Sequence, residues 1–87
     1  MKNQELAHIL YDIADYLAMD EVPFKPYAYQ RVALTLESME EDIEEIYQKG
    51  GTKALEGISG VGKNISLHIE EYIKTGKIGI YEQFRSE

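Results

Sequence analysis

Apolar residues recur at intervals of three and four along almost the whole chain, and no segment alternates apolar and polar residues for long. Such intervals place side chains on one face of an α-helix, whereas a half-buried strand needs strict alternation. The first apolar stripe lies in residues 3–19. It consists of Leu6, Ile9, Leu10, Ile13 and Leu17. The spacing therefore predicts an all-α fold without a sheet.

Capping residues and loops divide the chain into short helices. Asn3 is expected to cap the first helix, and Pro23 and Pro26 disfavour helix on their N-terminal side. Gly50 and Gly51 are expected to end an acidic third helix that begins at residue 40. The expected helical segments are residues 3–19, 27–38, 40–48, 53–56, 63–74 and 78–84. We predict one domain, residues 1–87, built as a small orthogonal bundle of five or six short helices.

Charge and composition exclude several classes of protein. The net charge is −7, and residues 1–50 hold 11 of the 16 acidic side chains, so the acidity belongs to the first half. Nucleic-acid binders are more often basic, and the composition alone argues against one. The chain has no cysteine, and no apolar run is long enough to span a membrane. We expect a cytoplasmic protein with no membrane partner.

The most informative segment is a glycine-rich turn, residues 57–62, between a short helix and a longer one. Gly57, Gly60 and Gly62 allow positive φ angles and the close approach of another backbone. The helix that follows points its free N–H groups at whatever approaches. This hairpin is a compact anion cradle into which one phosphate of a nucleic-acid backbone would fit.

The same residues match the start of the nucleotide-binding pattern G-x-x-x-x-G-K-[ST], which sequence reasoning rejects here. Asn64 stands where that pattern needs a hydroxyl for Mg²⁺. The turn also follows a helical segment, where a nucleotide-binding loop follows a buried strand. A tight connection between two helices is the simpler alternative to a binding loop.

The motif Ile58-Ser59-Gly60-Val61-Gly62-Lys63, followed by apolar residues at 65, 69 and 73, resembles a helix-hairpin-helix motif over about residues 52–74. The resemblance continues along the chain. It includes Leu10-x-x-Ile-Ala-Asp-Tyr-Leu17, the Pro23-Phe24 loop, Ala28-Tyr-Gln-Arg-Val-Ala33, Gly51-Thr-Lys-Ala-Leu-Glu-Gly-Ile58 and Ile69-Glu-Glu-Tyr-Ile-Lys-Thr-Gly-Lys77. In this order the segments are similar to the N-terminal domain of bacterial and archaeal family X DNA polymerases. That domain is equivalent to the small lyase domain of DNA polymerase beta.

The resemblance implies a site that binds DNA phosphates. The expected phosphate-binding residues are Gly60, Val61, Gly62, Lys63, Asn64, Lys25 and Tyr29. It also implies a monovalent cation, Na⁺ or K⁺, on the backbone carbonyls of Glu56, Ile58 and Val61, with no other cofactor required. The expected partner is gapped or nicked DNA, or a 5′-phosphate end, bound by a monomer or by part of a longer polymerase chain.

The resemblance also implies that the lyase chemistry of the polymerase beta branch is missing. His68 stands at the position of the lysine that forms the Schiff base, and Asn64 and Ile80 replace two lysines of the phosphate pocket. We expect His68 to be a partly buried, hydrogen-bonded residue without a catalytic role. The prediction is a non-sequence-specific DNA-binding module of DNA repair or synthesis, more probable than an enzyme. Two alternatives stay open: a 5′-deoxyribose-phosphate lyase that uses Lys63 or Lys25, and a helical protein-interaction module.

Overall fold

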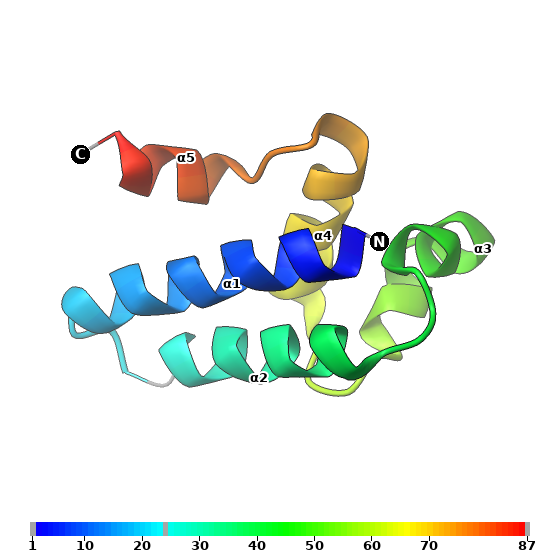
Figure 1. Ribbon diagram of the computed structural model, residues 1–87, viewed down its shortest axis with the longest axis horizontal. Coiled ribbons are helices and arrows are strands. Elements are labelled where there is room, and N and C mark those ends of the chain that lie inside the picture. Colours follow the sequence, from blue (N-terminus) through cyan, green and yellow to red (C-terminus); the bar gives the residue numbers. More distant parts are fainter. Residues whose placement is uncertain (1, 24, 87) are drawn as a thin grey trace.

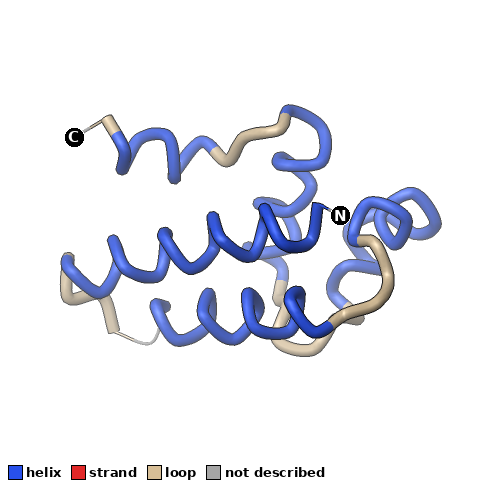
Figure 2. Tube along the Cα trace, viewed as in Figure 1, coloured by secondary structure: helices blue, strands red, loops and turns tan. Residues whose placement is uncertain are grey.

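The residues that the structure describes form five helices. The computed structural model describes residues 2–23 and 25–86, and these contain no strand, so the all-α prediction is confirmed (Figure 2). The helices are α1 (Lys2–Met19), α2 (Lys25–Ser38), α3 (Ile43–Glu56), α4 (Lys63–Thr75) and α5 (Gly79–Arg85). No helix among the described residues is long and apolar enough to cross a membrane.

The pair α1 and α2 is the most extensively packed in the structure, and the two helices run antiparallel (Figure 1). Leu6, Leu10 and Ile13 of α1 are completely buried, as are Val32 and Leu36 of α2. Burying one such side chain stabilises the fold by roughly 1.5–3 kcal/mol. The apolar stripe predicted for the first helix is therefore the inner face of this pair.

The other helices are arranged around this pair. α3 packs against α4, and α5 returns along α1, on the side of α1 away from α2 (Figure 1). The α5 contact is held by stacking of the Tyr16 and Phe84 rings, 5.1 Å apart, and by a 2.8 Å hydrogen bond from the Tyr81 hydroxyl to Asp12. α4 contributes the fully buried Ile69 and the almost fully buried Tyr72 to the core.

Two predicted boundaries are corrected by the structure. The third helix begins at Ile43 rather than at residue 40, because Asp42 is extended and its carboxylate accepts a 2.9 Å hydrogen bond from the Glu44 N–H. α2 begins at Lys25 rather than at residue 27, with Pro26 in its first turn as expected. Phe24 of the predicted loop lies outside the described residues.

The predicted break at the glycine pair is present inside α3. Gly51 has φ 65° and ψ −154°, which interrupts the helix between the acidic segment and the short segment that leads to the hairpin. A residue with a side chain rarely adopts this conformation. The break therefore lets the two parts of α3 take different directions.

Asn3 does not cap the first helix; this prediction was wrong. It lies inside α1 and is 1% exposed. Its Nδ2 donates to the Glu41 carbonyl at 2.7 Å, and its Oδ1 accepts from the Ile43 N–H at 2.8 Å. The side chain thus caps the start of α3 from a neighbouring helix.

Replacing Asn3 should destabilise the protein strongly. Asn3→Ala leaves the Ile43 N–H and the Glu41 carbonyl without their partner, and we expect the free energy of unfolding to fall by about 2–3 kcal/mol. Urea denaturation followed by circular dichroism measures this. The matched control is Asn64→Ala, since Asn64 is exposed and should change stability by less than about 0.5 kcal/mol. Equal stability of the two variants would contradict the bridging role of Asn3.

Candidate nucleic-acid interface

A tight turn joins α3 to α4. The N–H groups of Gly57 and Ile58 donate to the carbonyls of Ala54 and Leu55, at 3.1 and 3.0 Å, and so end α3. The Val61 N–H then donates to the Ile58 carbonyl at 3.0 Å, which closes the turn. α4 starts directly after this turn at Lys63, so the predicted helix-hairpin-helix geometry is present.

Gly60 and Gly62 differ in why each position is a glycine. Gly60 has φ 88°, and a Cβ atom there would lie 3.6 Å from the side chain of Arg31 on α2. Gly62 is extended, with φ −97° and ψ −170°, and a Cβ atom there would meet nothing within 4 Å. Gly60 is therefore required by the backbone conformation, whereas Gly62 borders open space.

The turn presents N–H groups that the protein does not use. Within the described residues, the amides of Gly60, Gly62, Lys63 and Asn64 donate no hydrogen bond to a protein acceptor. The N–H of Val61, also expected to bind phosphate, donates to the Ile58 carbonyl, and its side chain is buried in the core at 6% exposure. The remaining amides at the N-terminus of α4 can receive an anion.

A concave pocket of about 450 Å³ lies beside the hairpin. It contains six of the seven residues expected to bind phosphate, Val61 being the exception. The lining residues are Lys25, Ala28 and Tyr29 of α2, Gly60 and Gly62 of the turn, Lys63, Asn64, Ile65 and His68 of α4, and Ile80 of α5. The fold thus brings together residues that are up to 55 positions apart in the sequence.

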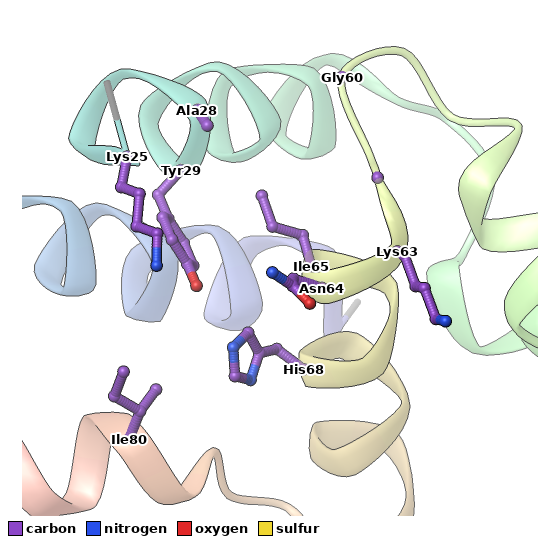
Figure 3. Close-up of a pocket in the computed structure, with 10 residues that line it drawn as sticks. Lys25, Ala28, Tyr29, Gly60, Lys63, Asn64, Ile65, His68 and Ile80 are labelled. Atoms are coloured by element: carbon purple, nitrogen blue, oxygen red, sulfur yellow. The ribbon is translucent and has the colours of Figure 1, made fainter. Parts of the chain in front are cut away.

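The side chains of the pocket do not all point into it. Those of Lys25, Tyr29, Asn64 and His68 face a common space, whereas Lys63 extends away from it (Figure 3). The rings of Tyr29 and His68 have centroids 6.2 Å apart. Burial raises the pKa of Tyr29, which keeps its hydroxyl protonated at neutral pH. Tyr29 therefore offers a neutral O–H group next to the imidazole.

The acidity of the chain does not extend to this pocket. Its lining holds two lysines and no carboxylate, and Arg31 lies next to the turn at Gly60. Glu71 of α4 is not part of the lining, although one of its oxygens lies 3.9 Å from Nδ1 of His68. A net charge of −7 therefore coexists with a locally basic surface, because charges more than about 8 Å apart are largely screened at physiological salt.

The three carbonyls expected to hold a cation differ in their use. The Ile58 oxygen accepts from the Val61 N–H, while those of Glu56 and Val61 accept no hydrogen bond from the turns and caps of the described residues. Carbonyl oxygens can replace the hydration shell of a monovalent cation. Two of the three carbonyls are therefore unused, and the bound Na⁺ or K⁺ stays a prediction. The described residues contain no cluster of three or more His, Asp or Glu side chains suited to a metal.

The prediction for His68 was incomplete. His68 is partly buried as expected, with its side chain 26% exposed. The expected hydrogen bond is not seen among the described residues, since its Nδ1 lies 3.9 Å from a Glu71 carboxylate oxygen, which is beyond hydrogen-bond distance. The residue also lines the pocket, in agreement with the resemblance, which placed it at the position of the Schiff-base lysine. Its spacing of four residues from Asn64, one helical turn, is consistent with this place.

The domain is all-α, and its glycine turn leaves free amides at the start of a helix. This is the architecture of a helix-hairpin-helix protein, a class that commonly binds DNA. The sequence pattern of the helix-hairpin-helix domain matches residues 1–78, so the chain belongs to that family. This membership indicates nucleic-acid binding in general. A search of the curated proteins finds no match to the chain.

Alanine substitutions at Gly60 and Gly62 should show at which of the two positions the backbone conformation requires glycine. Gly60→Ala forces a side chain into positive φ, and we expect it to lower the free energy of unfolding by about 1–2 kcal/mol. Gly62→Ala meets no neighbour and should change it by less than about 0.5 kcal/mol. Urea denaturation of both variants measures the difference, and an equal loss at the two positions would refute this assignment.

Proposed function

We propose that this chain is a non-sequence-specific DNA-binding module of DNA repair or synthesis, which docks its hairpin on a backbone phosphate of gapped or nicked DNA. The observation that carries the proposal is the set of unused amides at Gly60, Gly62, Lys63 and Asn64 beside a carboxylate-free pocket. Backbone N–H groups recognise phosphate oxygens and read no base, so they give binding without sequence preference.

The preference for interrupted DNA is supported by the shape of the site. A pocket that draws on α2, α4 and α5 is concave, and a phosphate in the middle of a continuous duplex cannot leave the backbone to enter it. A phosphate at a 5′ end can, and it carries more negative charge than an internal one. Lys25 and Tyr29 would hold such an end while Lys63, which points away, serves the neighbouring strand.

A monovalent cation completes the proposed contact. Na⁺ or K⁺ on the carbonyls of Glu56, Ile58 and Val61 would add a positive charge next to the hairpin amides. Glu56 is the last residue of α3, and the C-terminal end of a helix favours cations. The chain itself would bind the DNA phosphate through its amides and lysines.

The relationship to family X DNA polymerases is part of the proposal. It is supported by the order of the resembling segments, which covers the chain from the first helix to residue 77. In that setting the module would place an attached polymerase at a gap. As a monomer it would recognise the same DNA on its own.

The salt dependence of DNA binding tests the proposed contact. We expect an affinity of roughly 10⁻⁴–10⁻⁶ M for a gapped, 5′-phosphorylated duplex and a log–log salt slope of about −2 to −3, as for two or three phosphate contacts. Lys63→Gln should weaken binding about fivefold and bring the slope about one unit closer to zero. Fluorescence anisotropy at several salt concentrations measures both quantities.

The matched control is Lys74→Gln, which removes the same charge near the opposite end of α4. Lys74 is 3.8 Å from Glu70, and we expect its loss to change the affinity less than twofold. An equal effect of the two substitutions would contradict a contact at the hairpin. Absence of any salt-dependent binding would favour the protein-interaction alternative.

Lyase activity should be absent. Schiff-base chemistry needs a lysine amine that is neutral part of the time and held beside the aldehyde. His68 cannot sustain an imine, and the candidate replacements Lys25 and Lys63 are both exposed. In the presence of sodium borohydride, the chain should be trapped on a 5′-deoxyribose-phosphate substrate no more efficiently than a basic peptide is. Strong trapping that one lysine substitution abolishes would establish the enzyme instead, and His68→Lys is the change expected to increase trapping.

A further inference from the structure

We infer that the outer face of α2 is a docking surface for an amphipathic α-helix of another protein, one that carries a carboxylate midway along its apolar side. The inference goes beyond the proposed function, and the surface shares no residue with the pocket beside the hairpin. The observation behind it is a second groove, of about 350 Å³, on α2. Its lining residues are Tyr27, Gln30, Arg31, Leu34, Thr35 and Ser38.

The groove follows a single stripe along one helix. Its lining residues are separated by alternating steps of three positions and one position, which places them all on one face of α2. From Tyr27 to Ser38 the stripe is about 17 Å long, which is the length of a three-turn helix. Two helices pack lengthwise by fitting the side-chain ridges of one into the grooves of the other. The surface therefore fits a partner helix of about 11–12 residues.

α2 is apolar on two opposite sides. Its inner side buries four apolar residues in the core and lies along α1 (Figure 1). On its outer side Tyr27 and Leu34 are 67% and 63% exposed, and they are two of the four strongly exposed large apolar side chains among the described residues. A helix that is apolar all round is usually buried all round. The outer side of α2 is therefore suited to being covered.

The hydroxyl groups of the stripe are already used within α2. The Thr35 hydroxyl donates to the Arg31 carbonyl at 3.0 Å, and the Ser38 hydroxyl donates to the Thr35 carbonyl at 3.0 Å. The one acidic residue of α2, Glu37, accepts a 2.7 Å hydrogen bond from the Tyr11 hydroxyl of α1 and is not part of the groove. The stripe therefore carries one charge, that of Arg31.

Arg31 determines which charge the partner must carry. It is exposed, and none of the ion pairs within residues 2–23 and 25–86 includes it, although the chain has 16 acidic residues. Its stem lies beside the hairpin, 3.6 Å from the position that a Cβ atom would take at Gly60. A planar guanidinium pairs best with a carboxylate, which it can hold with two hydrogen bonds. The groove thus favours a partner with an acidic side chain opposite Arg31.

Two other occupants fit this groove less well. A nucleic-acid strand is held by several cations that neutralise successive phosphates, whereas the stripe offers one. A second copy of the chain would pair the stripe with itself about a two-fold axis. Because Arg31 lies about midway between Tyr27 and Leu34, it would then face the same arginine of the other copy. Tyrosine and arginine are, by contrast, the residues that dominate binding energy at contacts between different proteins.

A pair of designed peptides tests the inference. The first probe is a stapled helix of about 14 residues, with two leucines two turns apart on one side and a glutamate midway between them. The second probe has lysine in place of the glutamate. Stapling is needed because a free peptide of this length is barely helical. We expect the glutamate probe to bind with a Kd of roughly 10–100 μM, and the lysine probe to bind about tenfold more weakly. Fluorescence anisotropy measures both.

A charge reversal on the protein should reverse this preference. Arg31→Glu should bind the lysine probe about tenfold more tightly than the glutamate probe. Lys53→Glu is the matched control, because it makes the same change in net charge at an exposed position of α3 outside the groove, and it should still prefer the glutamate probe. Equal binding of the two probes, or an unchanged preference in Arg31→Glu, would overturn the inference.

Leu34→Gln separates this surface from the hairpin. It should weaken binding of the glutamate probe about fivefold to tenfold and change the affinity for a gapped duplex less than twofold, since Leu34 lies outside the pocket beside the hairpin. Loss of DNA binding with intact probe binding would instead leave the inference standing and remove the proposed function.

The other occupants give different results. NMR amide signals of Gln30, Arg31 and Leu34 should shift with the glutamate probe. If they shift with single-stranded oligothymidine and with neither probe, the groove belongs to the nucleic-acid interface and the inference is overturned. It is also overturned if sedimentation equilibrium of the chain alone shows a dimer that Leu34→Gln abolishes.

Discussion

The buried stripe of α1 is the constraint on which the rest of the structure depends, because α2, α3 and α5 all pack against this one helix. The pocket takes residues from α2, α4 and α5, and none from α1. Its shape is nevertheless set by α1, which fixes where α2 and α5 lie and, through the two hydrogen bonds of Asn3, where α3 begins. A helix without any residue in the site thus determines how far apart Lys25 and Ile80 are held.

The hairpin divides its groups between the core and the surface. Its apolar side chains turn inward, with Val61 and Ile65 less than a tenth exposed, and this leaves the backbone of the turn on the outside. Side-chain burial supplies the stability, and the unused main-chain N–H groups are left to donate to a ligand. Because these groups are part of the backbone, substitutions in the turn act mainly through conformation, as the positive φ of Gly60 illustrates.

The sequence predicted where the helical segments lie, and six of the seven residues expected in one candidate site do line a common pocket, because helical spacing and a short motif are local features. It did not predict the role of Asn3, whose partners are 38 and 40 positions away. Nor could it show that Lys63 points away from the pocket, since side-chain direction there depends on how the helices are arranged in space. The bond from the Val61 N–H to the Ile58 carbonyl is local, but the residue types alone do not reveal which N–H closes the turn.

The unequal distribution of charge has a consequence for how the molecule meets a polyanion. The acidic groups gather on α1 and before and within α3, while Lys25, Arg31 and Lys63 surround the turn and its pocket. Such a separation of charge creates an electric dipole moment, and the field of a polyanion would exert a torque that turns the basic side toward it. The same separation makes encounters with the acidic side repulsive. The net negative charge thus restricts the range of productive collision angles.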